Sequence, residues 1–219
     1  MKKMLTVLFG VLLFTGIQAA DWAAEKFILH NGAEVENGVL KLNKPKAYAT
    51  IPGTEKMAIR APGLTLACSV KAAYDLRKGE SEKMMDSYFS VPRALFTICR
   101  WGGLISTRVL DAKTGKYVIE RAYKIPQAGV WTHLAFVFEP VKDKAGAWRQ
   151  CFYVNGKKIY DKTLEKFFPR AGKGPVELGK GWGGPWMLTG EMTDIHIVQA
   201  PLTEAEVKAL AAKSRALKK

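Results

Sequence analysis

The sequence has little cysteine, three residues among 219, and no Cys or His pair has the short spacing that zinc ligands use. This argues against a zinc site. Cys68, Cys99 and Cys151 each lie in an apolar stretch typical of a strand. Three cysteines allow at most one intramolecular disulfide bond, which would leave one thiol free. We expect buried thiols that pack as small hydrophobic groups, with one disulfide bond as the alternative.

Acidic residues are also scarce, since 20 Asp and Glu face 34 Lys and Arg and give a formal net charge of +14. Two of these charges, Lys2 and Lys3, fall in a leader without acidic residues, so the rest of the chain retains +12. Such a charge favours anionic partners, for example an acidic polysaccharide or an envelope surface. The basic residues are scattered, however, and no nucleic-acid-binding motif accompanies them. We expect no specific nucleic-acid partner.

Long apolar runs are confined to the leader, "MKKMLTVLFGVLLFTGIQAADW". It opens with lysines, continues with apolar residues to about Phe14 and ends in the small residues Ala19 and Ala20, the order of a secretory signal peptide. An uncleaved anchor helix is the alternative, but the apolar stretch is short for one. We therefore expect a signal peptide at residues 1–19, one domain at residues 20–219 without a transmembrane span, and a secreted or periplasmic location.

Short strands between turn signals dominate the remaining chain. Nine segments combine β-branched, aromatic or alternating apolar residues with flanking Gly, Pro or Asn. They are residues 38–42, 64–70, 94–101, 117–125, 131–138, 149–154, 157–160, 175–179 and 190–198. This pattern predicts an all-β sandwich or barrel, and we expect one sheet folded over another. Residues 72–89 are charged with weak alternation, so we expect a long loop or a short helix there.

Two local motifs are more specific. Asn155-Gly156 separates two alternating runs, and this pair is the strongest short-range signal for a β-hairpin with a type I′ turn. At the C-terminus, we expect a helix over about 203–216. Thr203 and Glu206 can form a capping box at its start, and an apolar stripe through Val207 can dock on the sheet.

Four stretches in order resemble the C-terminal half of laminin G-like jelly rolls, in the broader concanavalin A-like lectin and glucanase fold. They are "VWTHLAFVFE", "RQCFYVNGKKI", "GPVELGKGW" and "MLTGEMTDIHIVQAPLTEAEVKAL". The resemblance is specific from about Val130 onward. It implies an all-β, two-sheet antiparallel jelly-roll sandwich with one C-terminal α-helix, in which Asn155 and Gly156 are architectural.

Some members of that family bind calcium, and others are glucanases. Calcium takes six to eight oxygen ligands, and this chain lacks a dense acidic loop; Asp194 and Glu191 are the best candidates for a weak calcium site. Retaining glucanases place two carboxylates about 5 Å apart on one face. Glu191 and Asp194 are three residues apart and are predicted to point to opposite faces of a strand. No spacing ties His133 to His196 as a lyase site would require, so we expect no catalysis and no cofactor.

Binding needs less than catalysis, and the Gly-rich stretches "CRWGGL" and "GKGWGGPWML" offer candidate aromatic platforms. Trp182 and Trp101 are the expected ligand-binding rings, with Arg100 and Lys180 as polar or anion-binding partners, whereas Trp186 is expected to pack in the core. The sequence therefore predicts an exported, non-catalytic binding module for a glycan or an anionic polysaccharide. The alternative is a protein-contact or adhesion module of the cell envelope; a glycoside hydrolase or polysaccharide lyase is less favoured.

Overall fold

The computed structural model describes residues 20–21, 26–54, 59–60, 62–73, 86–91, 96–101, 104–124, 127–169, 174–181 and 186–214. For residues 20–21, 96–101 and 121–124 the description covers the backbone. Strands dominate these residues, and one helix follows them. The elements are β1 (Ala20–Asp21), β2 (Ile28–His30), β3 (Glu34–Glu36), β4 (Val39–Leu42), β5 (Tyr48–Ile51), β6 (Leu64–Ala72), β7 (Asp86–Ser90), β8 (Phe96–Trp101), β9 (Leu104–Leu110), β10 (Tyr117–Lys124), β11 (Thr132–Pro140), β12 (Trp148–Val154), β13 (Lys157–Leu164), β14 (Val176–Leu178), β15 (Gly190–Val198) and α1 (Glu204–Lys213).

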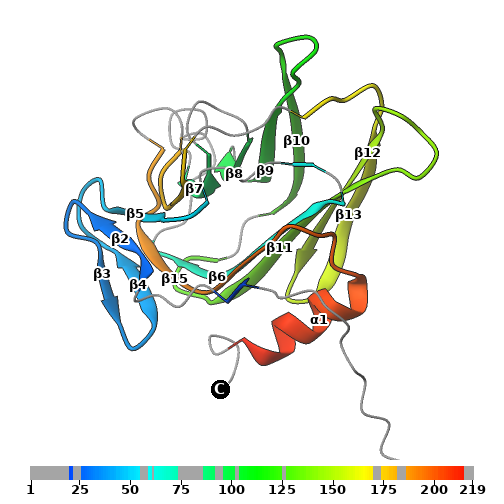
Figure 1. Cartoon of the computed structure of the whole chain (residues 1–219). Helices are drawn as coiled ribbons and strands as arrows, with labels where there is room; N and C mark the ends of the chain where they lie inside the picture. Colours follow the sequence, from blue (N-terminus) through cyan, green and yellow to red (C-terminus); the bar gives the residue numbers. More distant parts are fainter. Residues whose placement is uncertain are drawn as a thin grey trace, which may run out of the picture.

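The strands form two antiparallel sheets that face each other (Figure 1). The eight-stranded sheet has the order β13-β12-β11-β6-β15-β4-β3, with β1 paired to β15. The seven-stranded sheet has the order β10-β9-β8-β7-β14-β5-β2. Both sheets contain neighbouring strands that are not consecutive in the sequence, such as β6 and β15 or β7 and β14, as in a jelly roll, and the all-β, two-sheet prediction is confirmed.

Alternation of side chains places the core between the two sheets. In β6, Leu64, Leu66, Cys68 and Val70 are buried in this core, the face predicted from their spacing. A polar contact also crosses the interior: the amide nitrogen of Gln150 on β12 donates to Thr107 Oγ1 on β9 at 2.9 Å, with both side chains fully buried. This hydrogen bond joins the two sheets directly.

All nine predicted strand segments coincide with strands, but the prediction for residues 72–89 is wrong in part. Residues 64–72 and 86–90 are strands, so β6 and β7 enter that segment from both sides, while residues 74–85 lie outside the described residues. The nine predicted segments also leave out β1, β2, β3, β5 and β9. The strand β9 shows one reason. Its core-facing positions are Ile105, Thr107 and Val109, and the polar residue in the middle weakens the apolar alternation.

The predicted hairpin joins β12 to β13. Asn155 and Gly156 have φ of 49° and 77°, the positive values that a type I′ turn requires. Asn155 is also anchored to the neighbouring strand: its side-chain oxygen accepts from the His133 N–H at 2.9 Å, and its own N–H donates to the His133 carbonyl at 2.8 Å. The turn is architectural, as expected.

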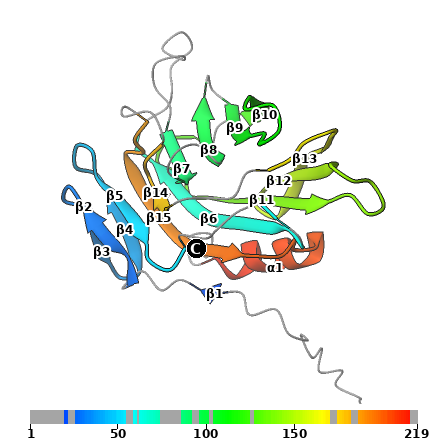
Figure 2. The same cartoon turned by 45° about the horizontal axis from the view of Figure 1, so that its top comes forward.

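The helix α1 covers the outer face of the eight-stranded sheet (Figure 2). Thr203 and Glu206 form the predicted capping box, and Val207 packs with Leu202 against Ala135 and Tyr153 of the sheet. The helix ends at Lys213, slightly before the predicted limit, where Ser214 caps it. No helix among the described residues is long and apolar enough to cross a membrane.

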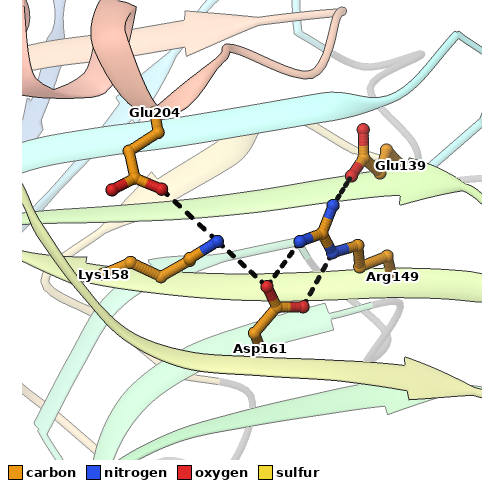
Figure 3. Close-up of polar contacts among 5 residues, drawn as sticks. All are labelled: Glu139, Arg149, Lys158, Asp161 and Glu204. Atoms are coloured by element: carbon orange, nitrogen blue, oxygen red, sulfur yellow. Dashed lines mark hydrogen bonds and ion pairs between the residues drawn. The ribbon is translucent and has the colours of Figure 1, made fainter.

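A chain of charged groups holds the start of α1 to the sheet (Figure 3). Arg149 on β12 donates to both oxygens of Asp161 at 2.7 and 2.5 Å and to Glu139 at 3.1 Å. Lys158 then bridges Asp161 at 3.0 Å and Glu204 of α1 at 3.4 Å. The bidentate Arg149–Asp161 pair holds the pKa of the Asp161 carboxyl well below its usual range.

Cys68 and Cys151 are free, buried thiols, which agrees with the expectation for these two residues. Cys68 lies in the core between the sheets, and Cys151 lies beneath α1. Burial raises the pKa of the Cys151 thiol to about 11, so it is protonated at neutral pH. The side chain of Cys99 lies outside the described residues.

Candidate functional site

The outer face of the seven-stranded sheet carries aromatic and charged side chains. On β5, Ala49 and Ile51 point into the core, so Tyr48 and Thr50 point outward. The strand register extends this outward row: Thr50 pairs with Glu177 of β14, and Glu177 pairs with Ser90 of β7. α1 covers the opposite side of the sandwich (Figure 2). Three non-adjacent stretches of sequence thus contribute to one polar face of the sheet, on which Thr50, Glu177 and Ser90 are themselves buried.

Lys180, a predicted site residue, lies at the centre of the first cluster on this face. Its ammonium nitrogen is 2.8 Å from the Glu177 carboxylate and 4.2 Å from the centroid of the Tyr48 ring. Tyr48 is stacked on His30 of β2, with ring centroids 4.2 Å apart and planes within 10°. The His30 ring in turn lies 3.0 Å from Thr50 Oγ1. These contacts fix one cation and two rings in a continuous chain.

A second cluster centres on Arg108 of β9. Its guanidinium carbon lies 5.1 Å from the centroid of Tyr117 and 4.9 Å from that of Trp186. Trp186 is half-buried and lies outside the hydrophobic core, so the prediction that it packs in the core is wrong. Leu188, two residues later, is in the core instead. The cation–π contacts with Arg108 keep the indole on the outer face.

The two clusters are joined at the ends of one loop. Lys180 forms a β-bridge with Met187, and the Gly181 N–H donates to the Trp186 carbonyl at 2.6 Å. Gly181 has no space for a side chain, because a Cβ there would lie 2.7 Å from Trp186 Cβ and would collide with Ser87 Oγ. We call the segment 180–187 the site loop; its ends, 180–181 and 186–187, are described, whereas residues 182–185 lie outside the described residues. Its ends bring both clusters together.

Polar groups of β7 also lie next to Gly181 and Glu177. Ser87 and Ser90 of β7 are fully buried, and neither hydroxyl has a hydrogen-bond partner within the described ranges. Glu177, beside Ser90, is 8% exposed. Burial alone would lower the pKa of Lys180, but the hydrogen bond and charge of Glu177 raise it, so Lys180 carries its proton at neutral pH.

The other predicted binding residues are placed only in part. Trp182 lies outside the described residues. Arg100 and Trp101 are at the end of β8, where Arg100 pairs with Asp86 and Ile105, and Trp101 pairs with Leu104; their side chains are outside the description. Of the predicted ligand-binding residues, Lys180 is therefore the one whose contacts are known.

The candidate calcium ligands have other partners. Glu191 forms an ion pair with Lys71 at 2.6 Å, and Asp194 accepts from the Ser214 hydroxyl at 2.7 Å. The two carboxylates lie on the same outer face, contrary to the prediction, because the strand has a register shift after Thr193 and Asp194 adopts a φ of 49°. In the part of the chain that the structure describes, no group of three or more His, Cys, Asp or Glu could hold a metal ion.

Comparison with protein families gives a match at residues 87–208 to the family model Laminin_G_3, described as the concanavalin A-like lectin/glucanases superfamily. The chain belongs to this superfamily. The matched region starts in β7 and ends inside α1, so it includes β14 and the site loop. Comparison with curated protein sequences gives no significant match.

Solved structures that share the fold include binding domains of botulinum neurotoxins and of a mosquitocidal protein. The botulinum neurotoxin serotype D ligand-binding domain in complex with N-acetylneuraminic acid has a TM-score of 0.63 and 11% identity, with 85% of this chain and 45% of that chain covered. The serotype G binding domain has a TM-score of 0.62 and 13% identity, covering 91% and 47%. The binding domain of Paraclostridial Mosquitocidal Protein 1 has a TM-score of 0.59 and 14% identity, covering 88% and 47%. This chain thus spans a little under half of each of these chains, and the likeness shows the fold alone.

Sequence reasoning missed the residues that surround Lys180. Tyr48 and Thr50 alternate with Ala49 and Ile51, which is a signal for an outward polar face. No local pattern indicates, however, that β5 pairs with β2 on one side and β14 on the other. The non-local pairing is what assembles the first cluster.

Proposed function

We propose that the protein is an exported, non-catalytic module that binds glycans, with sugars carrying a carboxylate as the preferred class. The binding surface is the outer face of the seven-stranded sheet around the site loop. The observation that carries the proposal is the position of the loop ends, which hold Lys180 against Tyr48 and Trp186 against Arg108 on this one face.

Each part of this surface has a role that suits a sugar. Aromatic rings can stack on the apolar carbon faces of a pyranose, and Tyr and Trp rings also carry a group that can form a hydrogen bond. Lys180 has three N–H donors, of which Glu177 takes one, so it can also donate to a sugar hydroxyl or carboxylate. The net charge of +12 that remains without the two leader lysines, from +14 for the whole sequence, supports an anionic ligand.

A non-catalytic role is supported by the arrangement of the acidic residues. Glu191 and Asp194 are engaged by Lys71 and Ser214 on the sheet that α1 covers. Glu177, a carboxylate on the proposed binding face, is paired with Lys180. A retaining glycosidase requires two carboxylates about 5 Å apart across the scissile bond. The three carboxylates named here are instead engaged with Lys71, Ser214 and Lys180.

The test is a glycan array that carries neutral and acidic sugars, probed with residues 20–219. Lys180→Ala is compared with Lys144→Ala, because Lys144 forms an ion pair of the same 2.8 Å length with Glu165 on a distant loop. We expect binding to acidic glycans that Lys180→Ala reduces at least about tenfold, or about 1.4 kcal/mol, and that Lys144→Ala leaves unchanged. Equal binding by both variants, or no glycan binding by the wild type, would refute the proposal.

The alternative is a protein-contact module. Ile28 and Leu29 favour it, because they are 52% and 40% exposed on β2, the last strand of the seven-stranded sheet. Exposed apolar residues on a terminal strand suit pairing with a strand of another protein. Two results together would favour this function over glycan binding: the protein binds no glycan on the array, and it binds a protein partner that the Ile28→Lys variant no longer binds.

A further inference from the structure

A row of polar side chains lies on the outer face of the eight-stranded sheet, under the C-terminal end of α1. His133, Ser69 and Thr193 are direct neighbours across β11, β6 and β15. Ser214, the residue that caps α1, inserts into this row and is 2% exposed. Its hydroxyl oxygen lies 2.7 Å from Ser69 Oγ and donates to Asp194 Oδ2 at 2.7 Å. The end of the helix is therefore attached to the sheet through buried hydrogen bonds.

His133 belongs to this row, but its side chain makes no hydrogen bond to any residue that the structure describes. It is fully buried, and neither ring nitrogen has a hydrogen-bond partner among the described residues. Its backbone holds the hairpin turn at Asn155 through two hydrogen bonds. The turn packs on the helix, since a Cβ on Gly156 would lie 3.2 Å from both Ala211 Cβ and Lys208 Cα. His133 thus lies where sheet, hairpin and helix meet.

The surroundings of His133 oppose its protonation. Burial and then the nearby His196 lower its pKa from 6.5 to about 4, against a smaller opposite effect of Asp194. His196 and Asp194 are both on β15. The other neighbouring elements contribute uncharged hydroxyl groups, Ser69 from β6 and Ser214 from the end of α1. An imidazolium at this position would have two N–H donors without acceptors in the described part of the chain, unless the helix moved and admitted water.

We propose that His133 is an acid-sensitive latch, whose protonation releases α1 from the eight-stranded sheet and exposes the apolar face beneath it. That face includes Ala67, Ala135, Val137, Cys151 and Tyr153. The latch is a property of the fold and does not depend on glycan binding.

The direction of the pH effect follows from the two protonation states. Above about pH 6.5 the imidazole is neutral whether α1 is docked or not, so docking is unaffected. As the pH falls from about 6.5 towards about 4, a solvated His133 takes up a proton that the docked state excludes, and undocking becomes more favourable. Below about pH 4 the docked state is protonated as well, and the effect reaches its limit.

Hydrogen exchange of residues 20–219 tests the latch. At about pH 4.5, corrected for intrinsic exchange, we expect the protection of α1 amides to be about fiftyfold to hundredfold lower than at about pH 7. The amides of residues 134–138 in β11 serve as the internal reference and should stay protected. In His133→Gln, which cannot be charged, the protection of α1 should not depend on pH in this range.

A second variant separates the latch from simple loosening. Ser214→Ala removes the hydrogen bonds at the helix end without removing a titrating group, so it should lower α1 protection by the same factor at both pH values. If His133→Gln does not fold, His133→Leu replaces it as the non-titrating variant. Equal acid loss in wild type and variant would refute the latch, as would exchange of β11 and α1 together or unchanged α1 protection in acid.

Discussion

The ammonium group of Lys180 lies 4.2 Å from the centroid of the Tyr48 ring, and Tyr48 is stacked on His30 at the same separation. The three residues come from distant parts of the sequence, and the pairing of β14 with β5, and of β5 with β2, brings them together. A cation held over a ring in this way is fixed in position before any ligand arrives. This preorganisation is the physical basis of the proposed glycan site.

Glu177→Gln is expected to strengthen binding of carboxylate-bearing glycans. The substitution removes the negative charge beside Lys180 while keeping a hydrogen-bond acceptor 2.8 Å from it. We expect affinity for acidic glycans to rise about twofold to tenfold, or about 0.4 to 1.4 kcal/mol, and affinity for neutral glycans to stay the same. Calorimetric titration of wild type and variant measures both. Weaker binding of acidic glycans by Glu177→Gln would contradict the assigned role of Lys180.

Gly156→Ala is expected to destabilise the fold more than Gly115→Ala. Both glycines have positive φ, 77° and 67°, so both substitutions impose backbone strain of about 1 kcal/mol. A Cβ on Gly156 would also press on Ala211 and Lys208 of α1, whereas Gly115 has no neighbour within 4 Å. Urea unfolding should give an additional loss of about 1 kcal/mol for Gly156→Ala. Equal losses would mean that α1 does not pack on the turn.

Much of the fold could be predicted from the sequence because local patterns determine it. The Asn155-Gly156 turn, the capping box of α1 and the alternation in β6 each depend on neighbouring residues. The exceptions are strands whose core-facing or flanking positions are polar. In β9 the core-facing Thr107 is satisfied by Gln150 of the opposite sheet, a partner that no local pattern can indicate.

The candidate site could be predicted only in part, for the same reason. Lys180 was identified by its place beside glycines and Trp182, but Tyr48 and His30 join it through non-local strand pairing. Trp186 was assigned to the core because apolar residues follow it, whereas Arg108 of β9 holds it on the outer face. Glu191 and Asp194 were assigned to opposite faces because a regular strand alternates, which the register shift in β15 alters.

The buried contact between Gln150 and Thr107 predicts a non-additive pair of substitutions. Thr107→Val leaves the fully buried amide of Gln150 without its acceptor and should destabilise the fold by about 1 to 3 kcal/mol. Adding Gln150→Leu removes the orphaned amide, so the double variant should recover part of the loss. A double-mutant cycle by chemical denaturation measures the coupling. Strictly additive losses would show that the hydrogen bond contributes nothing.

Asp161→Asn is expected to weaken the charged chain of Figure 3 by a modest, pH-dependent amount. Arg149 lowers the pKa of Asp161, so the ionised carboxylate stabilises the fold above about pH 4, and this contribution is lost as the pH falls below that value. Because the pair is partly exposed, the loss at neutral pH should be about 1 kcal/mol and should shrink in salt. Thermal unfolding of wild type and variant at two pH values checks this. If wild type and Asp161→Asn differ in stability by the same amount in strong acid as at neutral pH, the ionised carboxylate is not the cause of the difference.

The most direct test of the glycan site is chemical-shift mapping on isotopically labelled residues 20–219, titrated with N-acetylneuraminic acid and with glucuronic acid. We predict shifts of the amides in β5, β14 and the site loop, around Tyr48, Glu177 and Lys180, with little change in α1 or in the outer face of the eight-stranded sheet. Shifts confined to α1 or the outer face of the eight-stranded sheet, or no shifts with either sugar, would contradict the proposed function.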